Sequence, residues 1–258
     1  MNTRARAPSE RHRVANSLGA SVKLWAAIPE LFRRISSLGA RPRLVSRLLT
    51  QAGLRPGSRV IDLGCGKGSV GLELAARLAC GVVGVDLCPP FLAEAQAAAH
   101  RRGLAKRVSF ELADLRRWRP SRPVDAAVLL NGPPLHRAAK IARALVRPGG
   151  LYVIDDLILV GKPPERRKSC PQVPTIKAAR SIIERTGDTV LVVHVPSPSS
   201  VAAHNRRLNR RVEANAPRAR RLHPDLAADI DAYIEYLRWA EEMTSGPLRP
   251  VLWIVRRA

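Results

Sequence analysis

The sequence predicts an α/β fold in which helices cover a mostly parallel sheet. In residues 59–68, three apolar residues end in an acid, and glycines then follow at every second position. Apolar β-branched residues before such a turn are typical of a buried parallel strand that leads through a tight loop into a helix. Apolar strands then alternate with helical segments up to about residue 160. This alternation is the second sign of an α/β protein.

Three nucleotide-binding interpretations compete for the glycine loop at residues 62–68. A phosphate-binding P-loop has its first glycine where Ile61 stands and a hydroxyl residue where Gly68 stands. A dinucleotide-binding loop has a third glycine where Ser69 stands. The observed pattern, Asp-x-Gly-x-Gly-x-Gly, instead resembles motif I of the class I S-adenosylmethionine (SAM) methyltransferases. An acid just before the loop suits a cofactor with an amino-acid end, not one that carries a pyrophosphate.

The resemblance continues in order along the chain. Residues 68–80 predict a helix that ends at Gly81, and residues 82–87 predict a second buried strand that closes on Asp86. An acid about 20 residues beyond a glycine loop is placed to accept hydrogen bonds from ribose hydroxyls. By itself, this spacing fits NAD as well as SAM.

Later segments resemble the remaining parts of the SAM-binding core. Residues 89–102 predict a helix, residues 108–115 resemble the segment that flanks the adenine, and residues 124–131 resemble the fourth strand. Residues 146–150 resemble the turn before the fifth strand, which we expect at residues 151–154. The resemblance implies SAM contacts at a set of positions in these segments: Asp62, Gly64, Cys65, Gly66, Gly68, Asp86, Leu87, Ala113, Asp114, Leu115 and Asn131.

The resemblance implies a seven-stranded Rossmann-like sheet, mostly parallel with an antiparallel last strand, in a single domain over residues 19–258 with its SAM-binding core at 56–160. Residues 1–18 are polar and basic, and we expect a disordered tail. Residues 19–54 predict N-terminal helices, the first interrupted at Pro29 and the second ended by Gly53. In the family such helices often cover the cofactor, whereas helices that only pack on the sheet are the alternative.

Residues 175–185 predict a helix, and residues 189–195 and 251–255 predict the last two strands. Between these strands the family usually has a short connection, but here residues 199–248 intervene. Long connections with structure of their own tend to be functional. We interpret this segment as a two-helix cap over the site, with one basic and one acidic helix. A dimerisation element that forms a homodimer is the alternative.

The chain is strongly basic, with 44 Lys and Arg against 21 Asp and Glu and a formal net charge of +23. Such a field favours anionic partners. Arg206, Arg207, Arg210 and Arg211 recur at helical spacing, which fits either a nucleic-acid docking face or a solvated arginine-rich surface. Only 4% of residues are aromatic, so stacking platforms for single-stranded bases are not evident.

Neither a membrane span nor a secretory signal is evident, because apolar runs are short and the basic N-terminus lacks an apolar core. The four cysteines show no paired metal spacing: Cys65, Cys80, Cys88 and Cys170. We therefore expect a reduced cytoplasmic protein with free thiols and no membrane partner.

Candidate catalytic residues follow the fourth and fifth strands, where open α/β sheets bind ligands. Residues 131–136 resemble the (Asn/Asp)-Pro-Pro-aromatic motif of amino-methylating DNA enzymes, but an inserted glycine and a missing aromatic residue speak against base methylation. His136 is a candidate general base, with an exposed residue at the start of a helix as the alternative.

Asp155 and Asp156 are adjacent acids after an apolar strand and resemble the Asp-Asn pair that holds Mg²⁺ in catechol-type O-methyltransferases. With Asn131 they would offer oxygen ligands, but the fourth strand lacks an obvious third acid, so no metal is predicted. Direct polar contact of these carboxylates with substrate is the preferred interpretation, and capping of the following turn is the alternative.

The sequence therefore predicts a SAM-dependent methyltransferase that transfers a methyl group to an oxygen or nitrogen of a small-molecule acceptor by in-line displacement. An RNA or DNA methyltransferase that uses the basic surface is the alternative, favoured only by charge. A non-catalytic binding protein that keeps the fold is a third possibility.

Overall fold

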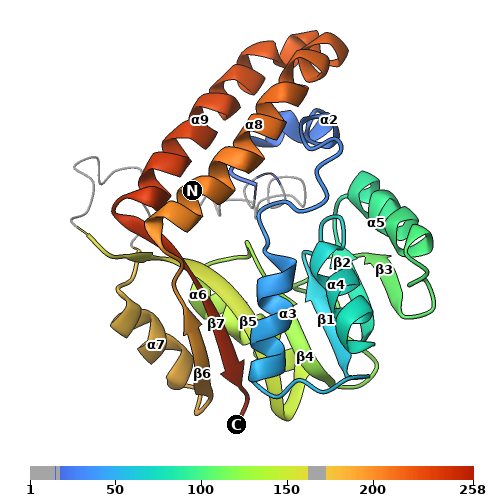
Figure 1. Cartoon of the computed structure of the whole chain (residues 1–258), viewed down its shortest axis with the longest axis vertical. Helices are drawn as coiled ribbons and strands as arrows, with labels where there is room; N and C mark the ends of the chain where they lie inside the picture. The colour runs from blue at the N-terminus through green and yellow to red at the C-terminus, as the bar shows by residue number, and fades with distance from the viewer. Residues whose placement is uncertain (1–14, 16–17, 162–172) are drawn as a thin grey trace, which may run out of the picture.

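A computed structural model describes residues 15, 18–161 and 173–258 and contains a seven-stranded sheet flanked by helices (Figure 1). The strand order is β3-β2-β1-β4-β5-β7-β6. The strands are β1 (Arg59–Leu63), β2 (Gly81–Asp86), β3 (Val108–Leu112), β4 (Val124–Leu129), β5 (Val146–Leu159), β6 (Thr189–His194) and β7 (Leu248–Arg256). Strands β1 to β5 pair in parallel, and β7 pairs antiparallel with both β5 and β6. The predicted fold class, including its antiparallel last strand, is confirmed.

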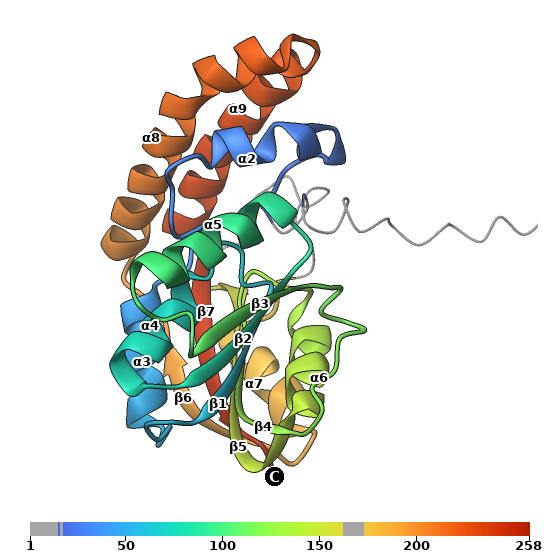
Figure 2. The same cartoon turned by 90° about the vertical axis from the view of Figure 1, so that its right-hand side faces the viewer.

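Two helical layers cover the sheet, as Figure 2 shows. One face packs against α3 (Pro42–Gln51), α4 (Ser69–Leu78) and α5 (Pro89–Arg101). The other face packs against α6 (Leu135–Leu145) and α7 (Ile176–Glu184). Because neighbouring side chains of a strand point to opposite faces, each central strand supplies both layers with apolar residues.

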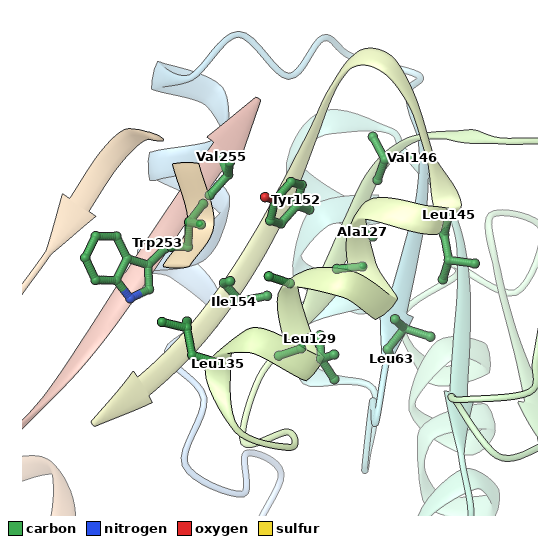
Figure 3. Packing of buried hydrophobic residues seen from close by; sticks show 14 of the residues in the cluster. Leu63, Ala127, Leu129, Leu135, Leu145, Val146, Tyr152, Ile154, Trp253 and Val255 are labelled. Carbon is green, nitrogen blue, oxygen red and sulfur yellow. The ribbon is translucent and has the colours of Figure 1, made fainter. Parts of the chain in front are cut away.

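In β5 and its neighbours, successive side chains alternate between the two faces of the sheet. Tyr152 and Ile154 point into the layer of α6 and α7, where Leu135 of α6 and Trp253 of β7 join them (Figure 3). Leu151 and Val153 are buried on the opposite face. A sheet buried on both faces needs nearly continuous apolar strands, which is the pattern in the sequence.

A third core lies beyond the carboxyl edge of the sheet. Here α8 (Pro198–Leu222) and α9 (Ala227–Ser245) form a helical hairpin through the short η3 (Pro224–Leu226), standing above the sheet in Figure 1. Its apolar side packs against η1 (Val22–Ala26) and α2 (Ile28–Leu31). The helical insertion expected before the last strand is therefore present, and it buries the N-terminal segment.

Three local expectations are corrected. The N-terminal helix is interrupted at Ala27, and Pro29 lies in the first turn of α2, where its missing N–H removes no helical hydrogen bond. Helix α4 ends at Leu78 with Ala79 in the left-handed region (φ 50°), so Gly81 begins β2 and does not cap the helix. These shifts are small because the apolar spacing is preserved.

The third correction concerns the fifth strand, which continues to Leu159 because β7 pairs with it from Leu151 onward. Asp155 and Asp156 therefore lie inside the strand and not after it.

In the part of the chain that the structure describes, no helix is long and apolar enough to cross a membrane. Cys65, Cys80 and Cys88 are buried free thiols, while Cys170 lies outside the described residues. The expected disordered tail also lies outside them except for two residues: Ala15 is buried, and Leu18 is partly buried.

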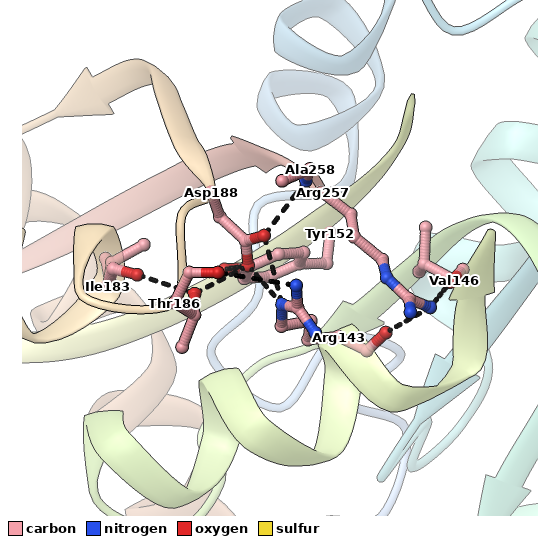
Figure 4. Close-up of polar contacts among 8 residues, drawn as sticks. All are labelled: Arg143, Val146, Tyr152, Ile183, Thr186, Asp188, Arg257 and Ala258. Carbon is pink, nitrogen blue, oxygen red and sulfur yellow. Dashed lines mark hydrogen bonds and ion pairs between the residues drawn. The ribbon is translucent and has the colours of Figure 1, made fainter. Parts of the chain in front are cut away.

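The buried carboxylate of Asp188, just before β6, joins α6, β5 and the C-terminal residue (Figure 4). Asp188 accepts hydrogen bonds from Arg143 Nε at 2.8 Å, Tyr152 Oη at 2.8 Å and the backbone N–H of Ala258 at 3.0 Å. Burial alone would raise the pKa of Asp188, but Ala258, Tyr152, Thr186 and Arg143 together hold it below its usual range. Its stabilising contribution is therefore present above about pH 4 and is lost as the pH falls through the folded pKa.

We expect Asp188→Ala to lower the free energy of unfolding by about 3 kcal/mol, because it leaves Arg143 and Tyr152 without their acceptor. Tyr152→Phe, which removes one hydroxyl donor, should cost only about 1 kcal/mol. Urea denaturation at neutral pH measures both. Equal effects of the two substitutions would contradict the assigned role of Asp188.

Candidate cofactor site and active centre

A pocket of about 620 Å³ opens at the carboxyl edge of the sheet beside β1 and β4. The strand order reverses between these strands, and open α/β sheets bind ligands at such a point. Its size is that of a small-molecule site, about 300–1,000 Å³. Most of the predicted cofactor residues line it: Asp62, Gly64, Cys65, Gly66, Asp86, Leu87, Ala113, Asp114, Leu115 and Asn131.

The glycine loop turns tightly between β1 and α4. Gly64, Gly66 and Gly68 all have positive φ angles, of 67°, 53° and 71°. A Cβ on Gly66 would lie 2.9 Å from Leu38 Cδ1, so a side chain here would displace the residue that covers the loop. A Cβ on Gly68 would lie 2.6 Å from the Phe110 ring. Gly68 does not line the pocket; it precedes α4 and allows α4 and β3 to pack closely.

Asp86, at the end of β2, anchors this loop. Its Oδ2 accepts a hydrogen bond from the Gly66 N–H at 2.8 Å, and its Oδ1 accepts one from the Cys88 N–H at 2.9 Å. Burial raises the pKa of Asp86, while these backbone donors oppose the rise. Each oxygen keeps a second lone pair for a ligand hydroxyl. Asp86 is therefore a hydrogen-bond acceptor whose position in the site is fixed.

Asp62, at the end of β1, is a second buried acid in the pocket. Its Oδ2 accepts a hydrogen bond from the Gly71 N–H at 3.1 Å. Burial raises its pKa to about 7, the Gly71 N–H opposes the rise, and the charge of Asp86 adds to it. A ligand cation beside Asp62 would favour its ionised form.

Lys67 is a pocket residue that the sequence analysis missed. Its side chain is only 3% exposed, and Nζ donates to the Phe32 carbonyl at 2.8 Å and to Glu94 Oε2 at 2.7 Å. The ammonium also lies 5.2 Å from the centre of the Phe91 ring, within the range of a cation–π contact. Lys67 thus ties the glycine loop to both the N-terminal segment and α5.

The outer wall of the pocket combines apolar side chains with one paired acid. Leu87, Ala113 and Leu115 supply the apolar surface. Asp114 accepts hydrogen bonds from the Arg116 guanidinium, the shortest at 2.7 Å, and from the Arg116 backbone N–H at 3.0 Å. This wall suits a flat, mostly apolar group with polar edges.

The N-terminal segment covers the pocket, and α8 holds that segment in place. Leu18, Leu38 and Ala40 line the pocket. Asn215 of α8 donates to the carbonyls of Leu31 and Arg33 at 3.0 and 2.8 Å. Within the described residues, neither α8 nor α9 contributes a side chain to the pocket lining. The insertion therefore acts on the pocket through the N-terminal segment.

The residues predicted as catalytic lie behind the pocket wall and do not line it. Asp155 Oδ1 accepts a hydrogen bond from the Asn131 N–H at 2.7 Å, and Asp156 Oδ2 accepts one from the Leu135 N–H at 3.1 Å. They brace the β4–α6 loop, in which Asn131 is left-handed with φ 52°. His136 is exposed on the first turn of α6.

The two acids of this brace differ in environment. Burial raises the pKa of Asp155 to about 7; the Asn131 N–H opposes the rise, and the charge of Asp156 adds to it. Burial also raises the pKa of Asp156, and the Leu157 and Leu135 N–H groups and His136 oppose this rise.

Among the described residues, no group of three or more His, Cys, Asp or Glu side chains is arranged to hold a metal ion.

Helix α6 supplies two further pocket residues that the sequence analysis missed, Arg137 and Ile141. Their spacing of i and i+4 puts them on one face of the helix that follows the β4–α6 loop. That spacing was readable in the sequence. The approach of Leu38 and Ala40 from the N-terminal segment had no local signal.

Comparison with known proteins agrees with this geometry. A family model described as a methyltransferase domain matches residues 60–150. A carboxy-S-adenosyl-L-methionine synthase of Chromohalobacter salexigens is 30% identical over 208 residues, covering 76% of this chain and 76% of that protein. A trans-aconitate 2-methyltransferase of Methylobacterium radiotolerans is 33% identical over 132 residues, 49% of this chain and 47% of that protein.

Solved structures show the same fold over nearly the whole chain. A SAM-dependent methyltransferase from Geobacter sulfurreducens in complex with S-adenosyl-L-homocysteine (SAH) matches with a TM-score of 0.76 and 21% identity, covering 90% of this chain and 98% of that chain. The [4+2]-cyclase SpnF matches with a TM-score of 0.71 and 19% identity, covering 97% of each chain. At this identity, the likeness establishes the fold and leaves the reaction to other evidence.

We expect Asp155→Asn to reduce the pH dependence of stability. Because the folded pKa of about 7 exceeds the unfolded value of about 3.9, the contribution of Asp155 to the wild-type free energy of unfolding should fall as the pH rises between these values and then level off. Asparagine cannot titrate, yet it keeps an oxygen for the Asn131 N–H.

Urea denaturation between pH 4 and 8 measures this dependence. Asp62→Asn is the matched comparison, because Asp62 has a similar raised pKa and should remove a separate part of the slope. An unchanged slope in Asp155→Asn would show that Asp155 ionises normally in the folded protein.

Proposed function

Because this chain belongs to the class I SAM-dependent methyltransferases, we propose that its pocket presents the methyl group of SAM to an oxygen or nitrogen of a small-molecule acceptor. The observation that carries the proposal is the convergence of Asp62, the glycine loop and Asp86 on one covered pocket. These groups suit the amino-acid and ribose parts of the cofactor. The family uses SAM as its methyl donor.

Each part of the pocket has a proposed role in holding SAM. Asp86 would accept hydrogen bonds from the ribose hydroxyls, and Asp62 would face the ammonium of the amino-acid end, where its ionised form is stabilised. Leu87, Ala113 and Leu115 would flank the adenine. Gly68 would act only by close packing against Phe110, and not by contact with SAM.

Bound SAM supplies an activated methyl group, so the protein mainly has to align the acceptor and exclude water. Leu38 and Ala40 would exclude water, because both line the pocket and Leu38 lies against Gly66 of the glycine loop. The β4–α6 loop would position the acceptor at Asn131. Asp155 and Asp156 would serve as positioning residues that fix this loop through its N–H groups.

A base is needed only when the acceptor is protonated. His136 is exposed and outside the pocket lining, so we assign it no chemical step. This arrangement favours an acceptor that is already nucleophilic at neutral pH, such as a carboxylate or an unprotonated amine.

A small-molecule acceptor is favoured over nucleic acid by the covered pocket and by relatives named for small acceptors, such as trans-aconitate. The RNA alternative keeps the support of the net charge of +23. We propose to separate the two by incubating the protein and SAM labelled in its methyl group with a metabolite extract and, in parallel, with total RNA. Label in a small metabolite is expected; label in RNA alone would contradict the proposal.

Mass spectrometry of ligand that copurifies with the protein tests the donor. We expect SAM or SAH. A carboxylated SAM, the product for which one relative is named, would overturn methyl transfer.

We expect Asp86→Ala to weaken SAM binding by about 1–3 kcal/mol, because it removes the ribose acceptor and leaves the Gly66 and Cys88 N–H groups unpaired. Calorimetric titration with SAM measures this change. Asp125→Ala is the control: that acid accepts a hydrogen bond from the Arg59 N–H, and it does not line the pocket. An unchanged dissociation constant in Asp86→Ala would show that the ribose contact lies elsewhere.

A further inference from the structure

A second hollow, of about 440 Å³, lies between the segment that follows α2 and the helix α8. Its walls carry five basic side chains among apolar and small ones, and we name it the arginine groove: the five are Arg41, Arg43, His204, Arg207 and Arg211. The first two come from the start of α3 and the other three from α8. Segments far apart in the sequence thus build one basic site.

The arginine groove adjoins the proposed cofactor pocket. Ala40 lines both hollows. Its neighbour Gly39 lies between them: its carbonyl accepts a hydrogen bond from His204 Nε2 at 2.9 Å, and a Cβ built on it would lie 3.5 Å from Asn131 Nδ2. A single segment of backbone would therefore separate a molecule in the groove from the β4–α6 loop.

The described part of the chain offers the groove no carboxylate partner. In residues 18–161 and 173–258, no carboxylate forms an ion pair with Arg41, Arg43 or Arg207. Other arginines of α8 do have acidic partners: Arg206 with Glu241, Arg218 with Glu30 and Arg220 with Asp231. Among the described residues, ion pairs are thus common along α8, whereas these groove arginines form none.

Arg41 is held in place by neutral groups. Its guanidinium donates to Ser200 Oγ at 3.0 Å and to the Ser200 carbonyl at 2.9 Å. Burial lowers the pKa of Arg41, and the charge of Arg207 lowers it further. His204, whose Nε2 donates to Gly39, has its pKa lowered by burial and by Arg41 and Arg207. Like charges gathered at one hollow are costly unless an anion joins them.

We propose that the arginine groove binds a phosphate group of the methyl acceptor, so that the acceptor spans from the groove into the cofactor pocket. The inference rests on the proposed function of that pocket. Guanidinium groups bind phosphate oxygens in a bidentate, charge-assisted manner. A phosphate with two negative charges matches several unpaired arginines better than a single carboxylate does.

A small phosphorylated molecule fits the groove better than a nucleic acid. The acids that pair with Arg206, Arg218 and Arg220 interrupt the charge along α8, so a continuous track for a phosphodiester backbone is not formed there. Aromatic residues make up only 4% of the chain, which offers little surface for stacked bases.

Calorimetric titration with inorganic pyrophosphate near physiological ionic strength tests the inference. We expect saturable binding that Arg207→Ala weakens by roughly tenfold, since a charge-assisted contact is lost. Arg43→Ala should act in the same direction. Arg210→Ala is the matched control, because Arg210 is exposed on the same helix and does not line the groove. Arg41 and Arg211 are unsuitable, because they also bond to backbone carbonyls.

Several outcomes would overturn the inference. These are an absence of pyrophosphate binding, an equal loss in Arg210→Ala and Arg207→Ala, or tighter binding of an RNA oligonucleotide that competes with pyrophosphate. Titration of each sample with SAH shows whether the phosphate site alone is wrong or the proposed function is wrong as well. SAH binding without pyrophosphate binding removes only the phosphate site; an absence of SAH binding removes the cofactor assignment as well.

Discussion

Asp86 Oδ2 accepts a hydrogen bond from the backbone N–H of Gly66 at 2.8 Å, and this contact joins the end of β2 to the glycine loop after β1. The Gly64 and Cys65 N–H groups donate to the Val85 carbonyl beside it, so the loop is held at several points. The loop can follow this path because its glycines accept positive φ angles. Its position in turn fixes Asp62, Lys67 and the floor of the pocket.

The same loop connects the sheet to the outer helices. Lys67 reaches from it to the Phe32 carbonyl, and α8 holds the neighbouring residues through Asn215. The N-terminal segment is thus held from both sides, by the loop below and by the insertion above (Figure 2). This arrangement gives the insertion an influence on the pocket without any side chain in it. It also leaves one face of α8 to form the arginine groove.

Local patterns in the sequence were sufficient for the sheet and for most of the cofactor pocket, because apolar periodicity and glycine spacing act over a few residues. Asp155 and Asp156 were misplaced because the length of β5 depends on its pairing with β7, far away in the sequence. Lys67 was missed because its partners, Phe32 and Glu94, come from separate elements. The arginine groove depends likewise on the distant approach of α8, which periodicity does not determine.

Hydrogen–deuterium exchange with and without SAH tests the central claim most directly, because it reports the glycine loop and its cover in the intact protein. The account predicts slower exchange with SAH at Gly64–Gly66 and Asp86–Cys88, and also at Leu38–Ala40, which contacts the loop. It predicts little change in β6, which is remote from the pocket lining. Unchanged exchange in both the loop and its cover at saturating SAH would contradict the account.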